Sequence, residues 1–501
     1  MCRLSLVDWL ATNLGQNHRP LLYQAVFAFE PEGKEEIDTT LAKKNLWPQL
    51  KELLSRAAVL DPACGSGSFL VGMLLVLDDL IMRANQQLNL IEPPYERRKA
   101  IIGRSLYGVD VMPWIVHVAE LRLWLQLVIE TELDPYEAQL FPFLPNLSFK
   151  VRPGDSLVQE VGGVNLNLHQ RGQLIIPAPL KARLTQLKNK KFNFFLGDAP
   201  GLSESSLKQE EFLLFREIMQ SKIKDLQEEV KQITRRIEAP RPKQLVFTGM
   251  EKKEPKQLSL APELLQQERD KKEEELVNLR EALAALKEDM PFIWDLAFVE
   301  IFAGDKQGFD IVIGNPPYVR QEKIHDPKGT YDKQTYKAKL QESVAAAWPV
   351  FFNYQYKNGV AAFNKVNGRS DLYIYFYLYG LSLINPKGTF CFITSNSWLD
   401  VGYGRDLQEF LLKHSQVKLI LDNKVKRSFS RADVNTVIVV LGAADDKHQA
   451  GLLKTARFVM FKTPFEEVLS PVIFEEIEET KSITNRPEFR CLAKSQKELY
   501  E

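Results

Sequence analysis

The chain of 501 residues carries 65 Lys and Arg against 65 Asp and Glu, and 45% of its residues are hydrophobic. This profile is typical of a soluble globular protein with two or three domains, and it excludes a disordered or collagen-like chain. Scattered cysteines without a CxxC pair favour a reducing, cytoplasmic location, and scattered histidines predict no metal site. The longest apolar stretch, at 69–77, is too short to span a membrane.

The chain begins with a helical pattern and then changes to an alternation of strands and helices. Residues 1–55 are expected to form helices and loops. Short apolar strands are predicted next, at 57–60, 105–109 and 148–152. The helices predicted between these strands cover Ser68–Gln87 and 113–133. Such an alternation predicts a parallel sheet that is covered by helices.

Residues 158–290 interrupt this alternation. Apolar residues recur three and four positions apart at 223–237 and again at 276–286, and a Pro- and Lys-rich link separates the two stretches. This spacing is typical of amphipathic helices, so we expect an antiparallel helical hairpin inserted into the sheet domain. A solvated spacer without a recognition role is the alternative.

The alternation resumes at residue 309. Strands are predicted at Phe309–Gly314, 388–394, 417–421 and 434–441, and helices at 371–384 and 398–414. A short basic loop joins the last two strands, which favours an antiparallel pair at the edge of the sheet. The predicted fold class is therefore α/β. Residues 443–501 are mixed and polar, and we expect them to begin a further domain.

The segment DPACGSGSFL at 61–70 lies directly between a predicted strand and a predicted helix. Gly65 and Gly67 allow a tight turn and a close approach of the backbone to a ligand. Asp61 ends the strand and can accept hydrogen bonds from a cationic or amino group. The dinucleotide fingerprint would need a third glycine where this chain has Leu70. A plain tight turn is the alternative for the two glycines alone, but the full strand–loop–helix context favours a binding loop.

Two further aspartates follow predicted strands. Asp110 suits the two hydroxyl groups of a ribose, and a helix N-cap before Pro113 is the alternative. Asp155, in Gly-Asp-Ser-Leu at 154–157, can accept a hydrogen bond from an exocyclic amino group, and a turn aspartate is the alternative. We expect these carboxylates and Asp61 together on the edge where open α/β sheets bind ligands.

The segment Asn315-Pro316-Pro317-Tyr318 follows the predicted strand Phe309–Gly314. Asn315 offers a side-chain carbonyl acceptor, and the two prolines fix the backbone and remove two amide donors. Tyr318 offers a flat face and a hydroxyl group. Such a pocket suits a planar ring that bears an amino group. A rigid loop that only ends the strand is the alternative.

On these residues the chain resembles the DNA adenine-N6 methyltransferases of the gamma arrangement, in which the cofactor motif precedes the catalytic motif. The resemblance is strongest to the large members of type IIG and related restriction–modification or phage-defence systems, and it covers roughly 56–158 and 290–442. The similar segments are DPACGSGSFL, LYGVDVM (106–112), GDSL, FDIVIGNPPYV (309–319), SDLYIYF (370–376), GTFCFITSNSWL (388–399) and FSRADVNTVIVVL (429–441).

The resemblance implies a Rossmann-like methyltransferase sheet, mostly parallel with an antiparallel edge hairpin and an inserted helical hairpin. The expected parts are an N-terminal helical segment (1–55), a cofactor-binding half (56–157), a coiled-coil-like insertion (158–290), a catalytic half (291–442) and a C-terminal segment that starts a target-recognition domain (443–501).

The resemblance also implies methyl transfer from S-adenosylmethionine to the adenine N6 of double-stranded DNA, with the target base flipped out of the helix. Cofactor contacts are expected from Asp61, Ala63, Gly65, Ser66, Gly67, Asp110 and Asp155. Asn315 and the Pro316 carbonyl, in a loop fixed by Pro317, are expected to accept from the N6 amino group. Tyr318 and Phe429 are expected to stack on the two faces of the flipped base.

The net charge is zero, so DNA binding has to come from local basic patches. Basic stretches at 320–339 and 413–431 flank the expected base pocket, and a third lies at 181–191. Contacts to the DNA backbone are expected from Arg320, Lys323, Lys424, Lys426, Arg427 and Arg431. Ordinary solvated faces are the alternative.

Two features of the family have no counterpart in this sequence. Nothing in 1–55 resembles the upstream cofactor motif with its Phe-Tyr-Thr-Pro core, and about 60 residues follow 441, where the family carries a target-recognition domain. We therefore expect a fragment or split subunit that acts with a separate specificity or nuclease subunit or domain. The alternatives are a protein-glutamine N5 or RNA methyltransferase, whose substrates also present a planar amino group, and a non-catalytic DNA-binding subunit.

Overall fold

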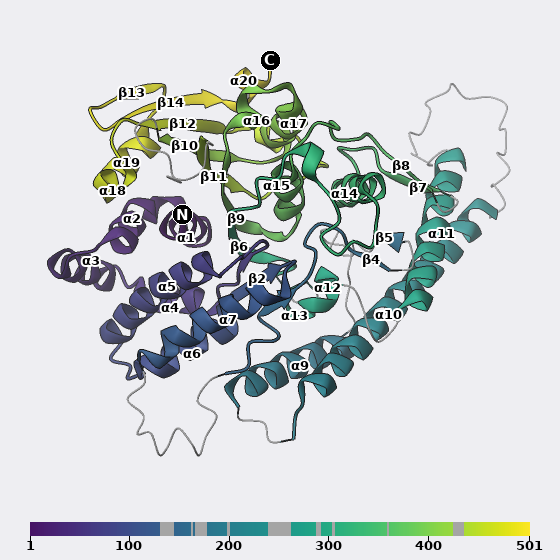
Figure 1. Ribbon diagram of the computed structural model, residues 1–501, viewed down its shortest axis with the longest axis horizontal. Coiled ribbons are helices and arrows are strands. Elements are labelled where there is room, and N and C mark those ends of the chain that lie inside the picture. The colour runs from purple at the N-terminus through teal and green to yellow at the C-terminus, as the bar shows by residue number, and fades with distance from the viewer. Residues whose placement is uncertain are drawn as a thin grey trace, which may run out of the picture.

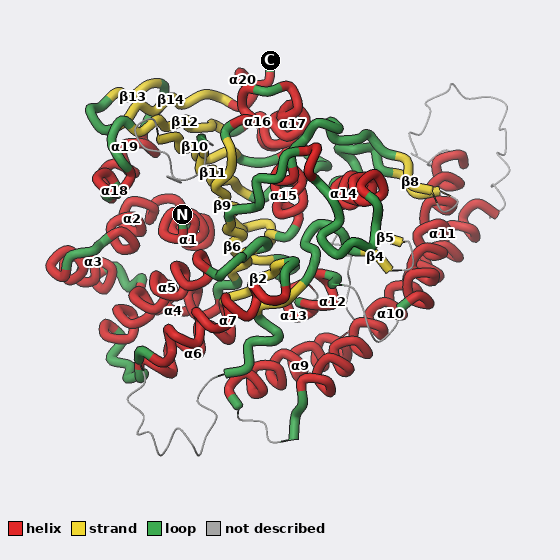
Figure 2. Tube along the Cα trace, in the orientation of Figure 1, coloured by secondary structure: helices red, strands yellow, loops and turns green. Residues whose placement is uncertain are grey.

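The described residues of the computed structural model form an α/β molecule with a large central sheet (Figure 1). They are residues 1–130, 145–161, 164–165, 178–197, 201–238, 262–286, 292–302, 306–357, 360–423 and 435–501. Figure 2 shows that helices surround the sheet and that a group of long helices extends along one side of the molecule.

The sheet has ten strands in the described part of the chain. They are β1 (Val59–Asp61), β2 (Leu106–Asp110), β3 (Val151–Pro153), β6 (Phe309–Gly314), β9 (Ile384–Ser395), β10 (Val417–Asn423), β11 (Thr436–Gly442), β12 (Thr455–Phe461), β13 (Ile483–Asn485) and β14 (Phe489–Ser495). Their spatial order is β3-β2-β1-β6-β9-β11-β10-β12-β14-β13. Neighbours from β3 to β9 are parallel, and β11 is antiparallel to β9 and β10. The predicted α/β fold class, with its mostly parallel sheet, is confirmed.

Both faces of this sheet are covered, which explains why its central strands are continuously apolar. One face carries α1 (Cys2–Leu14), α2 (Arg19–Phe27), α3 (Pro31–Lys43), α4 (Trp47–Arg56), α5 (Ser68–Gln87), α6 (Pro94–Ser105) and α7 (Pro113–Val128). The other carries α12 (Trp294–Ala297), α13 (Val299–Phe302), α14 (Lys333–Ala347), α15 (Leu372–Ser382), α16 (Ser397–Asp400) and α17 (Arg405–His414). Along β6, Ile311 and Ile313 enter the first core and Val312 enters the second. Among the helices that the structure describes, none combines the length and the apolar content needed to cross a bilayer.

The antiparallel pair predicted near 417–441 forms as β10 and β11, but its predicted position at the sheet edge is wrong. β12 pairs with β10 in parallel, and β14 and β13 extend the sheet further. Residues 455–495 therefore continue this sheet, together with α18 (Phe465–Val468), α19 (Pro471–Glu479) and α20 (Gln496–Tyr500). Their composition looks mixed because only alternate residues are buried, such as Phe489, Cys491 and Ala493 in β14.

The predicted helical hairpin is confirmed as α10 (Glu204–Glu238) and α11 (Pro262–Ala285). Ion pairs join Lys222 to Glu275 and Glu229 to Lys272, so residue numbers rise along one helix as they fall along the other. A further helix, α9 (Ala178–Leu196), packs on α10, and Figure 1 shows α10 and α11 running away from the sheet. Short strands β4 (Glu160–Val161), β5 (Val164–Asn165), β7 (Gln355–Lys357) and β8 (Val360–Ala362) form two small separate ribbons.

Candidate active site

The loop between β1 and α5 is the predicted glycine loop. Gly65 and Gly67 have φ angles of 51° and 77°, in the left-handed region that glycine adopts at little cost. A Cβ atom at Gly67 would lie 3.0 Å from that of Ala119 on α7, whereas a Cβ atom at Gly65 would meet nothing within 4 Å. Gly67 is therefore required for packing, and Gly65 leaves open space in front of the loop.

Asp110, at the end of β2, reaches this loop directly. Its Oδ2 accepts from the backbone N–H of Gly65 at 3.0 Å, and its Oδ1 accepts from the N–H of Met112 at 3.0 Å. The N-cap residue of α7 is Met112, so the alternative interpretation of Asp110 as that N-cap is wrong. Asp110 instead joins the glycine loop to the start of the next helix.

The turn at 154–157 also contacts the glycine loop. Ser156 Oγ donates to the carbonyl of Pro62 at 2.6 Å. Asp155 Oδ1 accepts from the N–H groups of Leu157 and Val158 at 2.8 and 3.1 Å, which is the geometry of a turn aspartate. The structure thus brings all three predicted carboxylates to one edge of the sheet.

Asp61 lies between the glycine loop and β6. It is 1% exposed, and its Oδ1 accepts from the N–H of Ala63 at 3.1 Å. A Cβ atom added to Gly314 would lie 2.9 Å from this same oxygen. Burial raises the pKa of Asp61 to about 8, the nearby charge of Asp110 adds to the rise, and the Ala63 N–H opposes it. Since Gly314 directly precedes Asn315, the two predicted motifs meet at Asp61.

The Asn-Pro-Pro-Tyr loop leaves β6 beside this carboxylate. The Oδ1 atom of Asn315 is buried and has no hydrogen-bond partner within the described part of the chain. The hydroxyl of Tyr318 donates to the carbonyl of Ile393 on β9 at 3.1 Å, and its ring packs edge-on against Tyr373 with centroids 6.4 Å apart. Burial raises the pKa of Tyr318, so this hydroxyl stays a neutral donor. The ring of Tyr318 is therefore fixed, while Asn315 keeps an unused acceptor.

Most of the residues predicted to contact DNA or the flipped base lie outside the described residues. They are Lys424, Lys426, Arg427, Phe429 and Arg431. Arg320 and Lys323 are exposed in the segment that follows Asn-Pro-Pro-Tyr, as a contact to the DNA backbone would require.

The third predicted basic stretch, at 181–191, is mostly neutralised by the insertion itself. Arg183, Lys190 and Lys191 pair with glutamates of α10, namely Glu217, Glu210 and Glu211. Lys191 is buried and also pairs with Glu300 at 2.8 Å. This stretch holds α9 against α10 and α13, so it is a poor candidate for a DNA contact.

The sequence did not reveal one residue beside the candidate site. Tyr336 lies within the basic stretch at 320–339, but it is 5% exposed and its hydroxyl donates to Asp155 Oδ2 at 2.8 Å. It follows that Tyr336 cannot stack on DNA from the surface. No sequence signal links two residues that lie 181 positions apart.

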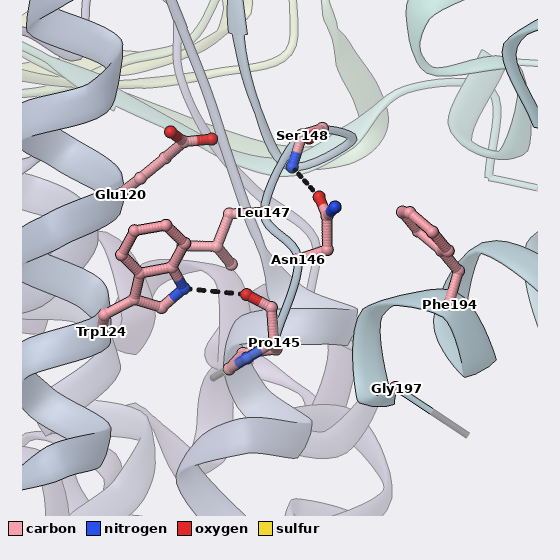
Figure 3. A pocket seen from close by; sticks show the side chains of 8 residues that line it. All are labelled: Glu120, Trp124, Pro145, Asn146, Leu147, Ser148, Phe194 and Gly197. Carbon is pink, nitrogen blue, oxygen red and sulfur yellow. Dashed lines mark hydrogen bonds between the residues drawn. The ribbon is translucent and has the colours of Figure 1, made fainter. Parts of the chain in front are cut away.

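A cavity of about 390 Å³ lies elsewhere, between α7, the segment before β3 and the end of α9 (Figure 3). Its lining includes Glu120, Trp124 and Phe194, and Trp124 Nε1 donates to the carbonyl of Pro145 at 2.8 Å. None of the predicted site residues lines it. It is therefore distinct from the candidate active site.

A parallel sheet with a glycine loop after β1 and Asn-Pro-Pro-Tyr after the neighbouring strand β6 is typical of the methyltransferase class of proteins. Comparison with known families agrees with this class. The model of the Eco57I restriction-modification methylase family matches residues 104–429, and that of the MmeI DNA-methyltransferase domain matches residues 37–157. The chain belongs to the Eco57I restriction-modification methylase family.

Curated relatives are much longer than this chain. A protein of Methanocaldococcus jannaschii, named as a type II restriction enzyme and methyltransferase, is 28% identical over 294 residues, 56% of this chain and 24% of its own. A type II methyltransferase of Geobacillus stearothermophilus is 29% identical over 114 residues, 23% of this chain and 16% of its own. The chain thus spans about a quarter or less of the length of these relatives.

Among solved structures, the type IIL restriction-modification enzyme MmeI in complex with DNA is similar over 89% of this chain and 37% of its own. The sequence identity is 13% and the TM-score is 0.38.

Proposed function

We propose that this chain holds the methyl-transfer centre of a DNA methyltransferase that modifies the N6 amino group of adenine in double-stranded DNA. The observation that carries the proposal is the Oδ1 atom of Asn315, which is buried without a partner in the described chain. An unsatisfied buried acceptor costs about 1–3 kcal/mol, and a ligand that donates to it would remove this cost. An amino group on a planar base is a donor of the required kind.

The glycine loop is the proposed seat of S-adenosylmethionine, which supplies an electrophilic methyl group on a sulfonium. The residues fit this cofactor in two respects. The open space beside Gly65 lets a ligand approach the backbone, and Asp110 keeps lone pairs for a ribose after accepting from Gly65 and Met112. Burial favours the protonated form of Asp61 in the free chain, and the cationic part of a bound cofactor would favour its ionised form. Asp155 would face the adenine ring of the cofactor.

The catalytic loop is proposed to orient the target amino group. Asn315 Oδ1 and the Pro316 carbonyl would accept its two protons, which directs the nitrogen lone pair at the methyl carbon and stabilises the positive charge that grows on nitrogen. Tyr318, whose hydroxyl is anchored to Ile393, would stack on the flipped base. By family resemblance Phe429 would cover the other face.

DNA binding is proposed to involve the exposed cations of the loop after the catalytic motif, Arg320 and Lys323, together with the basic segment 424–431. The M. jannaschii relative is named as both a restriction enzyme and a methyltransferase, and this chain spans 24% of it. We therefore propose that target recognition and cleavage belong to other parts or subunits of the complete system.

A radiolabelled methyl-transfer assay on duplex DNA, RNA and a protein mixture tests this function. The expected result is label in duplex DNA that nucleoside digestion identifies as N6-methyladenine. Label in RNA or on glutamine side chains would replace the proposed substrate with one of the alternatives. Cofactor binding without transfer to any substrate would favour a non-catalytic DNA-binding subunit.

A further inference from the structure

We propose that Tyr336 is a positioning residue that makes the cofactor site selective for a purine ring with an amino group. This inference rests on the proposed function, because it assigns Asp155 to the adenine ring of the cofactor. Tyr336 belongs to α14 and lies between the motif segments at 309–319 and 370–376, in neither of them.

The hydrogen bonds that Asp155 accepts leave one acceptor position of its carboxylate free. Oδ1 accepts from two backbone N–H groups, those of Leu157 and Val158. Oδ2 accepts from the Tyr336 hydroxyl at 2.8 Å. Since a carboxylate oxygen accepts about two hydrogen bonds, Oδ1 is filled and Oδ2 keeps one lone pair. The site can therefore satisfy a donor on the ring but not a carbonyl oxygen.

The hydrogen bond from the Tyr336 hydroxyl also favours the ionised form of Asp155, which is the form that accepts from a donor on the ring. Burial raises the pKa of Asp155, and the hydrogen bonds from Leu157, Tyr336 and Val158 oppose that rise. Without the hydroxyl, the carboxyl group would protonate more readily. A protonated carboxyl group donates as well as accepts, so it would tolerate a ring carbonyl.

The position of Tyr336 is itself well determined. Asp332 is the N-cap of α14, and its side chain accepts from the N–H groups of Gln334 and Thr335. Just before it, Asp326 accepts from the N–H groups of Lys328, Thr330 and Tyr331 and fixes the preceding loop. The segment that follows the catalytic loop thus supplies a hydroxyl to the carboxylate at the end of β3.

The test uses calorimetry on the full chain to measure the affinities of two ligands, S-adenosylhomocysteine and S-inosylhomocysteine. The first carries an amino group on its ring where the second carries a carbonyl. Wild type is expected to prefer the adenosyl ligand, and Tyr336→Phe is expected to reduce this preference by about tenfold. Tyr375→Phe, which removes another buried hydroxyl, should leave the preference unchanged.

A second pair of variants guards against a folding defect in Tyr336→Phe. In an Asp155→Asn background, the added Tyr336→Phe change should have no further effect on the preference, because the two residues act through one hydrogen bond. Equal weakening of both ligands in Tyr336→Phe, or an unchanged preference, would overturn the inference while leaving the proposed function intact. A wild-type chain that binds neither ligand would overturn the proposed cofactor site, and the inference with it.

Discussion

Asp61 lies where the glycine loop meets the end of β6, and its burial controls its charge. Its pKa in the folded chain is about 8, against about 4 for an exposed aspartate. Between these two values the folded chain keeps a proton that the unfolded chain has released. The stabilising contribution of this group is therefore complete below pH 4 and is lost as the pH rises towards 8.

Replacement of Asp61 by Asn removes this titration while keeping an oxygen that can accept from the Ala63 N–H. The free energy of unfolding of Asp61→Asn minus that of wild type should rise by up to ~1.4 kcal/mol per pH unit between about pH 4 and 8, and then level off. Urea denaturation of both chains at pH 5, 7 and 9 measures this difference. A difference that does not change with pH would contradict the assigned pKa.

Residues with a local signal were predictable, and those whose role depends on distant partners were not. The glycine loop, Asp110, Asp155 and Asn315 stand out because each follows an apolar strand with an unusual residue pattern. Their meeting at one edge follows from the parallel pairing of the strands that carry them. Tyr336 had no such signal, because a lone tyrosine in a charged helical stretch looks like a surface residue.

At the scale of elements, helix α1 is tied to the sheet by buried charges. Asp8 is 1% exposed and pairs with Arg19 at 2.7 Å and with Lys418 of β10 at 2.5 Å. It also accepts from Thr389 Oγ1 of β9 at 2.6 Å. Burial alone would raise the pKa of Asp8, but Lys418 and Arg19 outweigh it and lower the pKa. Helix α1 is thereby fixed to β9 and β10, two strands that follow the Asn-Pro-Pro-Tyr loop in the chain.

Breaking this network should be costly because it removes the carboxylate that Lys418 pairs with and leaves Arg19, among the described residues, only its ion pair with Glu478. Asp8→Ala is expected to lower the free energy of unfolding by ~3–5 kcal/mol. The control is Glu52→Ala, which breaks an ion pair with Arg56. The side chains of Arg56 and Glu52 are 67% and 66% exposed, so this change should cost less than ~0.5 kcal/mol. Urea denaturation at neutral pH measures both variants, and similar small losses would refute the structural role of the network.

Elements with long apolar runs were predicted well. The helix Ser68–Gln87 and the strand Phe309–Gly314 have the predicted bounds, because burial on several sides leaves an unbroken apolar pattern. Strands β12 and β14 were not predicted. Both mix buried and exposed residues, and the polar residues hide the apolar pattern. The contact of α1 with β9 and β10 was also beyond prediction, since its partners lie about 400 residues away.

For the whole molecule, the zero net charge means that DNA affinity has to depend on local cations. Arg320 and Lys323 are exposed in the segment that follows Asn-Pro-Pro-Tyr. The affinity for duplex DNA should therefore fall steeply with added salt. A plot of log K for DNA binding against log salt concentration has a negative slope. In the double variant Arg320→Ala and Lys323→Ala, this slope should become less steep by about 2.

Fluorescence anisotropy with labelled duplex DNA over a range of salt concentrations measures this slope. Lys494→Ala is the control, because Lys494 lies on β14 and pairs with Glu498. A salt response that is flat in wild type, or equal in the two variants, would contradict a DNA-binding role for this segment.

The measurement that tests the central claim most directly compares Asn315→Ala with wild type in single-turnover methylation of duplex DNA and in calorimetric binding of S-adenosylmethionine. If Asn315 completes the pocket for the target amino group, transfer should fall by at least ~10²-fold. Cofactor affinity should stay within about twofold of wild type, because the proposed cofactor contacts come from the glycine loop and the three aspartates and not from Asn315. Unchanged methylation, or a parallel loss of methylation and cofactor binding, would contradict this account.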